Sequence, residues 1–370
     1  MLTLHRSAVV GVGLAGVLAL AGCGSDNNAK SQPSSGGSSG TTSAAAISCA
    51  DGSLTGTGST FQLNIEKQWI SDYLAKCSAA KVDYTGTGSG AGISQFGAGT
   101  VDYAGSDSLM KADAQAKADA RCGTGNKAIH LPVTAGAVVL TYNLPNVSGV
   151  KLSAAVVAEM FQGTITKWDD QKVAADNPGT KLPPLAVQAV HRSDSSGTTD
   201  IFSNFLDANA KGVWTLGTGK DLKWPTGQSA KGSDGTTNAV KAAPGALTYT
   251  ELSFAKANGL PTASLKNAGG QYVAPAGAGV SKALEAATID TSKGDLRAKV
   301  DYASTDPASY PASAVTYVIV CDKGNKSAAL LKGFLGYVST GGQDSADRLG
   351  YAPLPTKVAG PVKAAIAALA

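Results

Sequence analysis

Segments with strand-like and helix-like patterns alternate along this 370-residue chain from Ser48 onward, and this alternation limits its fold more than any other feature. Strands are predicted at residues 53–58, 81–85, 100–104, 128–142, 185–190, 246–250 and 314–320. Helices are predicted at residues 61–76, 90–97, 111–121, 152–161, 199–206, 234–242, 327–338 and 360–369. Because strands and helices that alternate in this way form mostly parallel sheets with helices on both faces, the chain is predicted to be an α/β protein.

The predicted strand at 128–142 is long and β-branched, and we interpret it as leaving one α/β unit for another. The sequence therefore predicts two lobes, each a mostly parallel sheet flanked by helices, joined by crossing strands. We expect lobe I to hold residues 48–133 and 313–370, and lobe II to hold residues 134–312. Ligands of open α/β sheets bind at the carboxyl ends of strands, so a ligand is expected in the cleft between the lobes.

The composition excludes several classes of protein. Hydrophobic residues make up 43% of the chain, enough for a sizeable core, which excludes global disorder. Basic and acidic residues number 31 and 27, and no long Lys/Arg run is present, so a nucleic-acid partner is not expected. With three His in total, neither a metal site built from several His nor His-dependent catalysis is expected.

The N-terminus is typical of an export signal. His5 and Arg6 precede an uncharged run at residues 8–20, which is too short to span a membrane as a helix and suits a signal peptide. Small residues then lead to Cys23, which resembles a bacterial lipobox, where the cysteine becomes a lipidated N-terminus. We predict a signal peptide at 1–22 and a lipid-anchored, Gly/Ser-rich flexible linker at 23–47. A plain signal with cleavage near this cysteine is the alternative.

Four cysteines remain in the body, an even number that suits an oxidising compartment. They allow three pairings, of which we favour Cys49–Cys77 and Cys122–Cys321. Cys49 leads into the first predicted strand, and Cys77 ends the helix that returns beside it. Buried free thiols are the alternative, and the absence of a C-x-x-C pair argues against zinc.

Three predicted junctions between a strand and a helix share one composition. They are GTGSTF at residues 56–61, GTGSGAG at 86–92 and RSDSSGTTD at 192–200. Each places glycines, hydroxyls and free N–H groups where a helix begins, and helix N-termini of this kind bind anions. Ser and Thr are also ordinary helix N-caps, so one such loop has a purely structural reading. Three in one chain favour an anion site.

Two charged residues refine this hypothesis. Arg192 offers a planar fork of donors suited to an oxyanion, and Asp194 is placed to hold that fork; the alternative is a surface ion pair. Asp107 ends the predicted third strand, at the same sheet edge as the loops. A carboxylate there favours an anion that carries a proton, as hydrogen phosphate does and sulfate does not. Its alternative role is to cap the helix that begins near Lys111.

These segments resemble the phosphate-binding component of bacterial phosphate-specific ABC transporters, most closely the lipid-anchored actinobacterial type, from about residue 53 to 355. DYAGSD at 102–107 matches the strand whose last Asp accepts the phosphate proton. The resemblance implies a two-lobed, periplasmic-binding-protein-like fold of type II. Gln62 stands where many members have Pro, and Ser195 where they commonly have Gly. The ligand positions that the resemblance implies are Thr60, Phe61, Ser89, Asp107, Arg192, Ser196, Gly197 and Thr198, with Asp194 orienting the arginine.

The resemblance implies a receptor rather than an enzyme. It would bind inorganic phosphate outside the cytoplasm and deliver it to the permease subunits of an ABC transporter. We expect no cofactor, no metal and no nucleic acid, a monomeric state, and attachment to the outer face of the cytoplasmic membrane through Cys23.

Three other functions stay open on the sequence alone. The segment 86–91 fits the G-x-G-x-x-A pattern of dinucleotide-binding enzymes, with Asp107 about 20 residues later. A secreted phosphatase would use a serine, yet no G-x-S-x-G elbow is present, and His130 and His191 are the only histidines beyond the signal. His191 lies on an apolar strand, where a core or rim role suits it better than that of a general base. A receptor for sulfate or molybdate is the third alternative.

Overall fold

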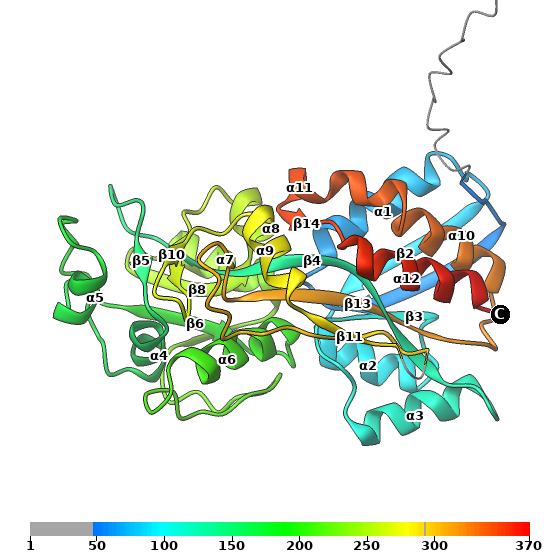
Figure 1. Ribbon diagram of the computed structural model, residues 1–370, viewed down its shortest axis with the longest axis horizontal. Coiled ribbons are helices and arrows are strands. Elements are labelled where there is room, and N and C mark those ends of the chain that lie inside the picture. The colour runs from blue at the N-terminus through cyan, green and yellow to red at the C-terminus, as the bar shows by residue number, and fades with distance from the viewer. Residues whose placement is uncertain (1–46, 292–293) are drawn as a thin grey trace, which may run out of the picture. The chain divides into compact units, whose positions relative to one another are not determined.

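The computed structural model describes residues 47–291 and 294–370 (Figure 1). The predicted signal peptide, Cys23 and the linker up to residue 46 lie outside the described residues. The strands are β1 Gly52–Gly58, β2 Ala80–Gly86, β3 Tyr103–Ser106, β4 Ala128–Tyr142, β5 Lys151–Leu152, β6 Gln188–Arg192, β7 Gln228–Ala230, β8 Ala246–Glu251, β9 Ser264–Lys266, β10 Tyr272–Val273, β11 Thr288–Asp290, β12 Arg297–Lys299, β13 Ser313–Cys321 and β14 Tyr351–Ala352. The helices are α1 Leu63–Leu74, α2 Ser89–Gly97, α3 Ala112–Cys122, α4 Ala154–Gln162, α5 Gln171–Asp176, α6 Gly197–Asn209, α7 Gly232–Ala242, α8 Leu252–Ala257, α9 Gly277–Glu285, α10 Ala328–Val338, α11 Ala346–Leu349 and α12 Thr356–Ala368, with a 3-10 turn η1 at Gly341–Ser345.

A nine-stranded sheet forms the centre of the fold, in the order β2-β1-β3-β13-β4-β8-β6-β7, with β14 paired to β4. Its two ends are parallel: β2, β1 and β3 run together, and so do β8, β6 and β7. We call the side with β1–β3 lobe I and the side with β6–β8 lobe II. The two parallel groups confirm the predicted α/β fold with two lobes.

The central strands β4 and β13 join the two lobes. All fifteen residues of β4 are buried, which explains why its sequence is apolar almost throughout. Its first part pairs antiparallel with β13, and its last part, Val138–Tyr142, pairs antiparallel with β8. Figure 1 shows both strands running from one group of parallel strands to the other. The long strand predicted at 128–142 is therefore confirmed, including its crossing role.

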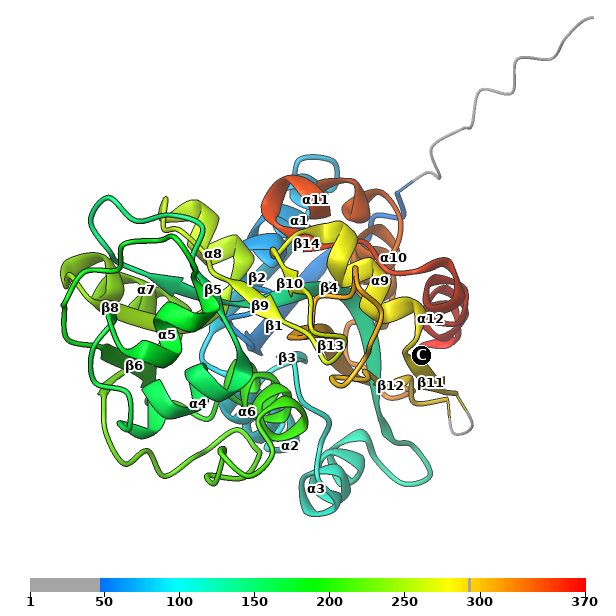
Figure 2. The same cartoon turned by 60° about the vertical axis from the view of Figure 1, so that its left-hand side comes forward.

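Helices cover both faces of the lobe I sheet. Successive side chains of a strand point to opposite faces, so Tyr103 and Ala104 of β3 enter different cores. Tyr103 packs near Phe334 of α10, with ring centroids 6.2 Å apart, whereas Ala104 joins the cluster that includes Phe96 of α2. Figures 1 and 2 show α1, α10 and α11 on one side of these strands and α2 and α3 on the other.

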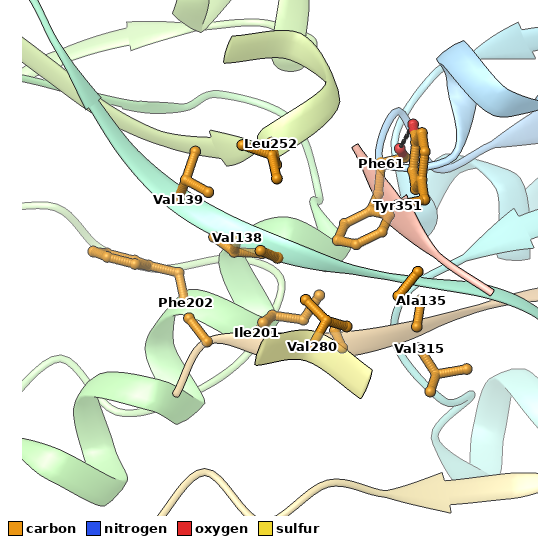
Figure 3. Packing of buried hydrophobic residues seen from close by; sticks show 14 of the residues in the cluster. Phe61, Ala135, Val138, Val139, Ile201, Phe202, Leu252, Val280, Val315 and Tyr351 are labelled. Atoms are coloured by element: carbon orange, nitrogen blue, oxygen red, sulfur yellow. Dashed lines mark hydrogen bonds between the residues drawn. The ribbon is translucent and has the colours of Figure 1, made fainter. Parts of the chain in front are cut away.

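A continuous core surrounds β4. Val138 and Val139 point to opposite sides of the strand, toward Ile201 of α6 and Leu252 of α8 respectively (Figure 3). Phe61 lies in the same core, with its ring centroid 6.1 Å from that of Tyr351. Burying a large apolar side chain contributes about 1.5–3 kcal/mol, so this core fixes the chain at both ends of β4.

Two predicted strands are displaced in the structure. Thr100 does not enter β3, because its N–H and its hydroxyl both donate to the carbonyl of Gln95, each at 3.1 Å, and so finish α2. Residues 185–187 precede β6, since they pair with the loop at 166–168 instead of with β8. The boundaries move because local backbone groups compete with the sheet for the same hydrogen bonds.

Both favoured disulfides are confirmed. Cys49 and Cys77 are joined, with their Cα atoms 5.3 Å apart, and Cys122 and Cys321 are joined, with Cα atoms 5.4 Å apart. The second bond ties the end of α3 to the end of β13. Within the described residues, no helix is long and apolar enough to cross a membrane.

Candidate functional site

The predicted loops meet where the strands of the two lobes end. In lobe I, β1, β2 and β3 are parallel, so the loops that follow Gly58, Gly86 and Ser106 leave the same edge of the sheet. In lobe II, β6 ends at Arg192 and leads into α6. The strand order places both sets of loops beside the crossing strands, so four segments distant in sequence face one another.

Asp107 is the centre of the lobe I side. Its Oδ1 accepts hydrogen bonds from Ser59 Oγ at 2.6 Å and Thr316 Oγ1 at 2.7 Å, and its Oδ2 accepts one from Ser89 Oγ at 3.2 Å. Burial raises the pKa of Asp107 to about 6, although the hydrogen bonds from Ser59 and Thr316 act in the opposite direction. Asp107 is thus a buried carboxylate that accepts three side-chain hydrogen bonds, and the structure gives it no capping contact with α3.

The first loop holds its backbone toward this acid. The Phe61 N–H donates to Ser59 Oγ at 2.9 Å, while Tyr351 donates its hydroxyl to the Phe61 carbonyl at 2.7 Å (Figure 3). The Phe61 ring is fully buried in the core, which anchors the loop. Thr60 turns its hydroxyl the other way and meets Ser233 Oγ of lobe II at 2.7 Å.

Arg192 is the charged centre of the lobe II side. Its guanidinium donates to both carboxylate oxygens of Asp194, at 2.7 and 2.5 Å, so Asp194 fixes the plane of the guanidinium. A third nitrogen, Nη1, donates to Thr198 Oγ1 at 3.2 Å and Ser233 Oγ at 3.3 Å. Burial lowers the pKa of Arg192, but the bond to Asp194 and the charges of Asp194 and Glu251 outweigh it, so the pKa is raised overall. The guanidinium is therefore a permanent buried cation.

The N-terminus of α6 approaches Asp107 closely. Ser196 caps this helix, accepting the Thr199 N–H at 3.2 Å. A β-carbon placed on Gly197 would lie 2.5 Å from both Asp107 Oδ2 and Ser89 Oγ, far inside contact distance. Only a glycine allows the helix N-terminus to come so near to the acid, which brings a partial positive charge to this point.

Further hydrogen bonds join the two lobes around this point. Gly90 donates its N–H to the Ser195 carbonyl at 2.9 Å, and Ser108 donates its hydroxyl to Asp200 at 2.5 Å. A pocket of about 830 Å³ touches Gly90 and Ser195, and another of about 410 Å³ reaches Asp107 beside α6 and β12. The eight predicted ligand residues thus lie near one another between the lobes, and all eight are buried.

The sequence reasoning missed several residues of this cluster. Gln62 is fully buried, and its side-chain amide oxygen lies 2.8 Å from Thr316 Oγ1 of β13, so the residue at this departure from the usual Pro contacts β13. The contacts of Thr316, Ser233 and Glu251 depend on strand order and carry no local signal. Ser59 could have been found, because it lies inside the GTGSTF motif.

The two histidines among the described residues make structural contacts. His130 is buried, bonded through Nδ1 to Asp295 at 2.9 Å and accepting the Met110 N–H at 3.1 Å. His191 is half-buried and stacks on Trp224 with ring centroids 4.9 Å apart, which agrees with a rim role. No group of three or more His, Cys, Asp or Glu in the described ranges is placed to hold a metal ion.

Known proteins are similar to this chain in sequence and in fold. A family model described as a PBP superfamily domain matches residues 43–340. Phosphate-binding protein PstS 3 of Mycobacterium tuberculosis is 37% identical over 369 residues, which is 98% of each chain. The chain belongs to the PstS family of phosphate-binding proteins. Another member, phosphate-binding protein PstS of Methanocaldococcus jannaschii, is 37% identical over 327 residues, 82% of each chain.

Solved structures agree with the PstS assignment at the level of the fold. A high affinity periplasmic phosphate-binding protein, PfluDING, solved with bound phosphate, superposes with a TM-score of 0.68 at 22% identity and covers 85% of this chain and 93% of its own. A phosphate-binding protein from Stenotrophomonas maltophilia gives a TM-score of 0.63 at 21% identity, over 85% and 94% of the two chains. The predicted two-lobed fold of the binding-protein class is therefore confirmed.

Proposed function

We propose that this chain is an extracytoplasmic receptor that binds inorganic phosphate between its lobes and delivers it to the permease of an ABC transporter. One observation carries the proposal: a buried carboxylate, Asp107, lies against the N-terminus of α6, and Thr198 in the first turn of that helix accepts a hydrogen bond from the Arg192 guanidinium. A protonated oxyanion satisfies all three groups at once, because its O–H donates to the acid while its other oxygens accept from the donors. The family membership and the names of its relatives support phosphate as that anion.

The donors come from both lobes. On the lobe I side they are the Thr60 hydroxyl, the Phe61 N–H and the Ser89 hydroxyl; on the lobe II side they are Arg192 and the α6 N-terminus with Ser196, Gly197 and Thr198. Since neither half offers a complete set, binding favours the closed arrangement of lobes. We take lobe I as residues 48–133 and 313–370 and lobe II as 134–312, with the hinge in the crossing strands. The receptor makes and breaks no covalent bond.

The place of the receptor follows from its N-terminus. The lipobox-like sequence at Cys23 supports a lipid anchor on the outer face of the cytoplasmic membrane, with residues 24–46 as a tether. A monomer is sufficient, because one chain supplies every group named above.

Titration calorimetry with phosphate, sulfate and a dinucleotide tests the function. We expect saturable binding of phosphate at one site per chain and no measurable heat from the other two ligands. Sulfate binding as tight as that of phosphate would point to a general oxyanion receptor, and binding of the dinucleotide alone would overturn the proposal.

A further inference from the structure

Ser233, which is not among the ligand positions named so far, lies between the two sides of the site. It is in the first turn of α7 and is only 1% exposed. Its Oγ lies 2.7 Å from Thr60 Oγ1 of lobe I and accepts a hydrogen bond from Arg192 Nη1 of lobe II at 3.3 Å. One serine hydroxyl thus connects the buried cation of one lobe with a hydroxyl of the other.

The start of α7 is held by the same carboxylate that holds Arg192. Asp194 Oδ1 accepts a hydrogen bond from Arg192 Nε at 2.7 Å and another from the Gly232 N–H at 2.9 Å. Gly232 has a φ of +69°, in the left-handed region that favours glycine, and Ser233 follows it directly. The backbone therefore sets the position of the serine beside the guanidinium.

The number of protons in this cluster shows what it can do. A guanidinium only donates, so Ser233 Oγ uses a lone pair to accept from Arg192. Thr60 and Ser233 carry two hydroxyl protons, and the bond between them uses one. Among the described residues neither oxygen has a further hydrogen-bond partner, so the second proton has no acceptor. A buried donor without an acceptor costs free energy, and an anion between the lobes would supply that acceptor.

Two arrangements of these protons satisfy the contacts, and Arg192 favours one of them. If Ser233 donates to Thr60, each hydroxyl accepts on one side and donates on the other. The charge of the guanidinium then polarises both bonds in the same direction. If Thr60 donates to Ser233 instead, Ser233 accepts twice and Thr60 has no proton left for a ligand. Only the first arrangement keeps Thr60 as the donor that the proposed function requires.

We propose that Ser233 is a positioning residue that directs the Thr60 proton to the bound anion. Arg192 donates to Ser233, Ser233 donates to Thr60, and Thr60 donates to an oxygen of the anion; we call this series the donor relay. Because it runs from lobe II to lobe I, the relay is complete only when the lobes are closed. This inference rests on the proposed function, since it assigns a role to a residue beside the same ligand.

Phosphate titration calorimetry of wild type, Ser233→Ala, Thr60→Val and the double variant tests the relay. We expect Ser233→Ala to weaken phosphate binding about tenfold, because a hydrogen bond that serves a charged group is lost. Thr60→Val should weaken binding more, since it removes the donor itself. The double variant should bind phosphate as Thr60→Val does, because Ser233 acts only through Thr60.

Thr236→Val is the matched control for these variants. Thr236 is also buried in α7, and its hydroxyl donates to the Ser233 carbonyl at 3.2 Å and not to the site. This variant should keep the wild-type affinity. If Ser233→Ala does not fold, Ser233→Thr and Ser233→Val replace it, because they differ only in a hydroxyl against a methyl group. We then expect the threonine variant to bind phosphate more tightly, and equal affinities would overturn the relay.

The remaining outcomes each have one meaning. A loss in Ser233→Ala as large as that in Thr60→Val, or larger, would reduce the pair to a contact between lobes and overturn the relay. Additive losses in the double variant would also overturn it, because Ser233 would then act independently of Thr60. Wild-type affinity in Ser233→Ala would remove Ser233 from the site. Absence of phosphate binding by wild type would instead refute the proposed function.

Discussion

At the scale of single residues, Arg192 combines two features that are seldom found together: full charge and 5% exposure. Its bidentate contact with Asp194 fixes the guanidinium plane and leaves Nη1 directed at Thr198 and Ser233. This geometry makes the side chain a donor whose position is set before the ligand arrives.

We predict that Arg192→Ala weakens phosphate binding by about 2–5 kcal/mol, because both the anion and Asp194 then lack their buried cation. Calorimetry measures the change. Arg348→Ala is the matched control, since Arg348 is exposed on α11 and should leave affinity unaltered. Unchanged binding in Arg192→Ala would place the anion elsewhere.

We propose that Asp107 distinguishes an anion that carries a proton from one that carries none. With Asn at this position, the side chain offers a neutral amide to an oxygen that bears no hydrogen. We predict that Asp107→Asn lets sulfate compete, with a gain of about 1–3 kcal/mol for sulfate relative to phosphate. Competition dialysis with labelled phosphate measures this gain. Strong sulfate competition against wild type would contradict the role given to Asp107.

Asp107 and Arg192 were predictable from the sequence because each closes a recognisable strand and lies next to a glycine-rich or hydroxyl-rich turn. Thr316 and Glu251 were not. Thr316 reaches Asp107 from a strand more than 200 residues later, at a register shift between Thr316 and Tyr317 that no local pattern encodes. Contacts of this kind depend on strand order, which is a property of the whole sheet.

At the scale of elements, the N-terminus of α6 can contribute to an anion site between the lobes only if it comes close to lobe I. We predict that Gly197→Ala lowers phosphate affinity at least about tenfold, because the added methyl group meets Asp107 and Ser89 at 2.5 Å and holds the lobes apart. The stability of the ligand-free protein should change little. Affinity is measured by calorimetry and stability by thermal melting.

Gly336→Ala controls for the general effect of glycine replacement. Gly336 lies within α10, and a β-carbon there would meet nothing within 4 Å. This change should leave phosphate affinity unaltered and raise stability by about 0.4–1 kcal/mol. Equal affinities for the two alanine variants would show that close approach by α6 is not required.

The two disulfides should differ in what they contribute. Cys122–Cys321 spans 199 residues and Cys49–Cys77 spans 28, so the first restricts the unfolded chain more. We predict that replacing Cys122 and Cys321 by Ser lowers the free energy of unfolding by about 2–5 kcal/mol, and that replacing Cys49 and Cys77 by Ser costs less. Urea unfolding measures both. The reverse order would show that native-state strain outweighs loop entropy.

The main elements were predictable because each has a clear pattern: β4 is apolar almost throughout, and α1 has one apolar face. The short elements β5, β7, β9–β12, β14, α5, α8, α9 and α11 escaped prediction, since most have only two to six residues, too few to distinguish strand, helix and loop by periodicity. The displaced starts of β3 and β6 have a different cause. In both cases a neighbouring loop takes backbone hydrogen bonds that the pattern alone assigns to the sheet.

At the scale of the whole molecule, we have proposed that the sequence around Cys23 anchors the receptor to the membrane. We predict that Cys23→Ala moves the protein from the membrane fraction to the medium, because the acyl chains that hold it there can no longer be attached. Immunoblotting of both fractions measures the shift, with Cys49→Ser as a control that spares the anchor. A variant that stays with the membrane would contradict lipidation.

The two-lobed plan itself was predictable from strand and helix alternation, because parallel α/β units allow few other arrangements. The antiparallel pairing of β4 with β13 at the centre was less accessible. It requires a strand near residue 130 to meet one near residue 317, and the intervening lobe has to fold for that meeting to occur.

The course of β4 has one more consequence. Fifteen buried residues of a single strand supply hydrogen-bonding partners to β13 on one side and to β8 on the other. If the gene were divided inside this strand, each product would expose a strand edge whose backbone N–H and C=O groups have lost their partners, and such an edge promotes aggregation. Neither half is therefore expected to survive as a separate protein, and engineers who wish to recombine halves from different relatives will have to exchange both crossing strands together.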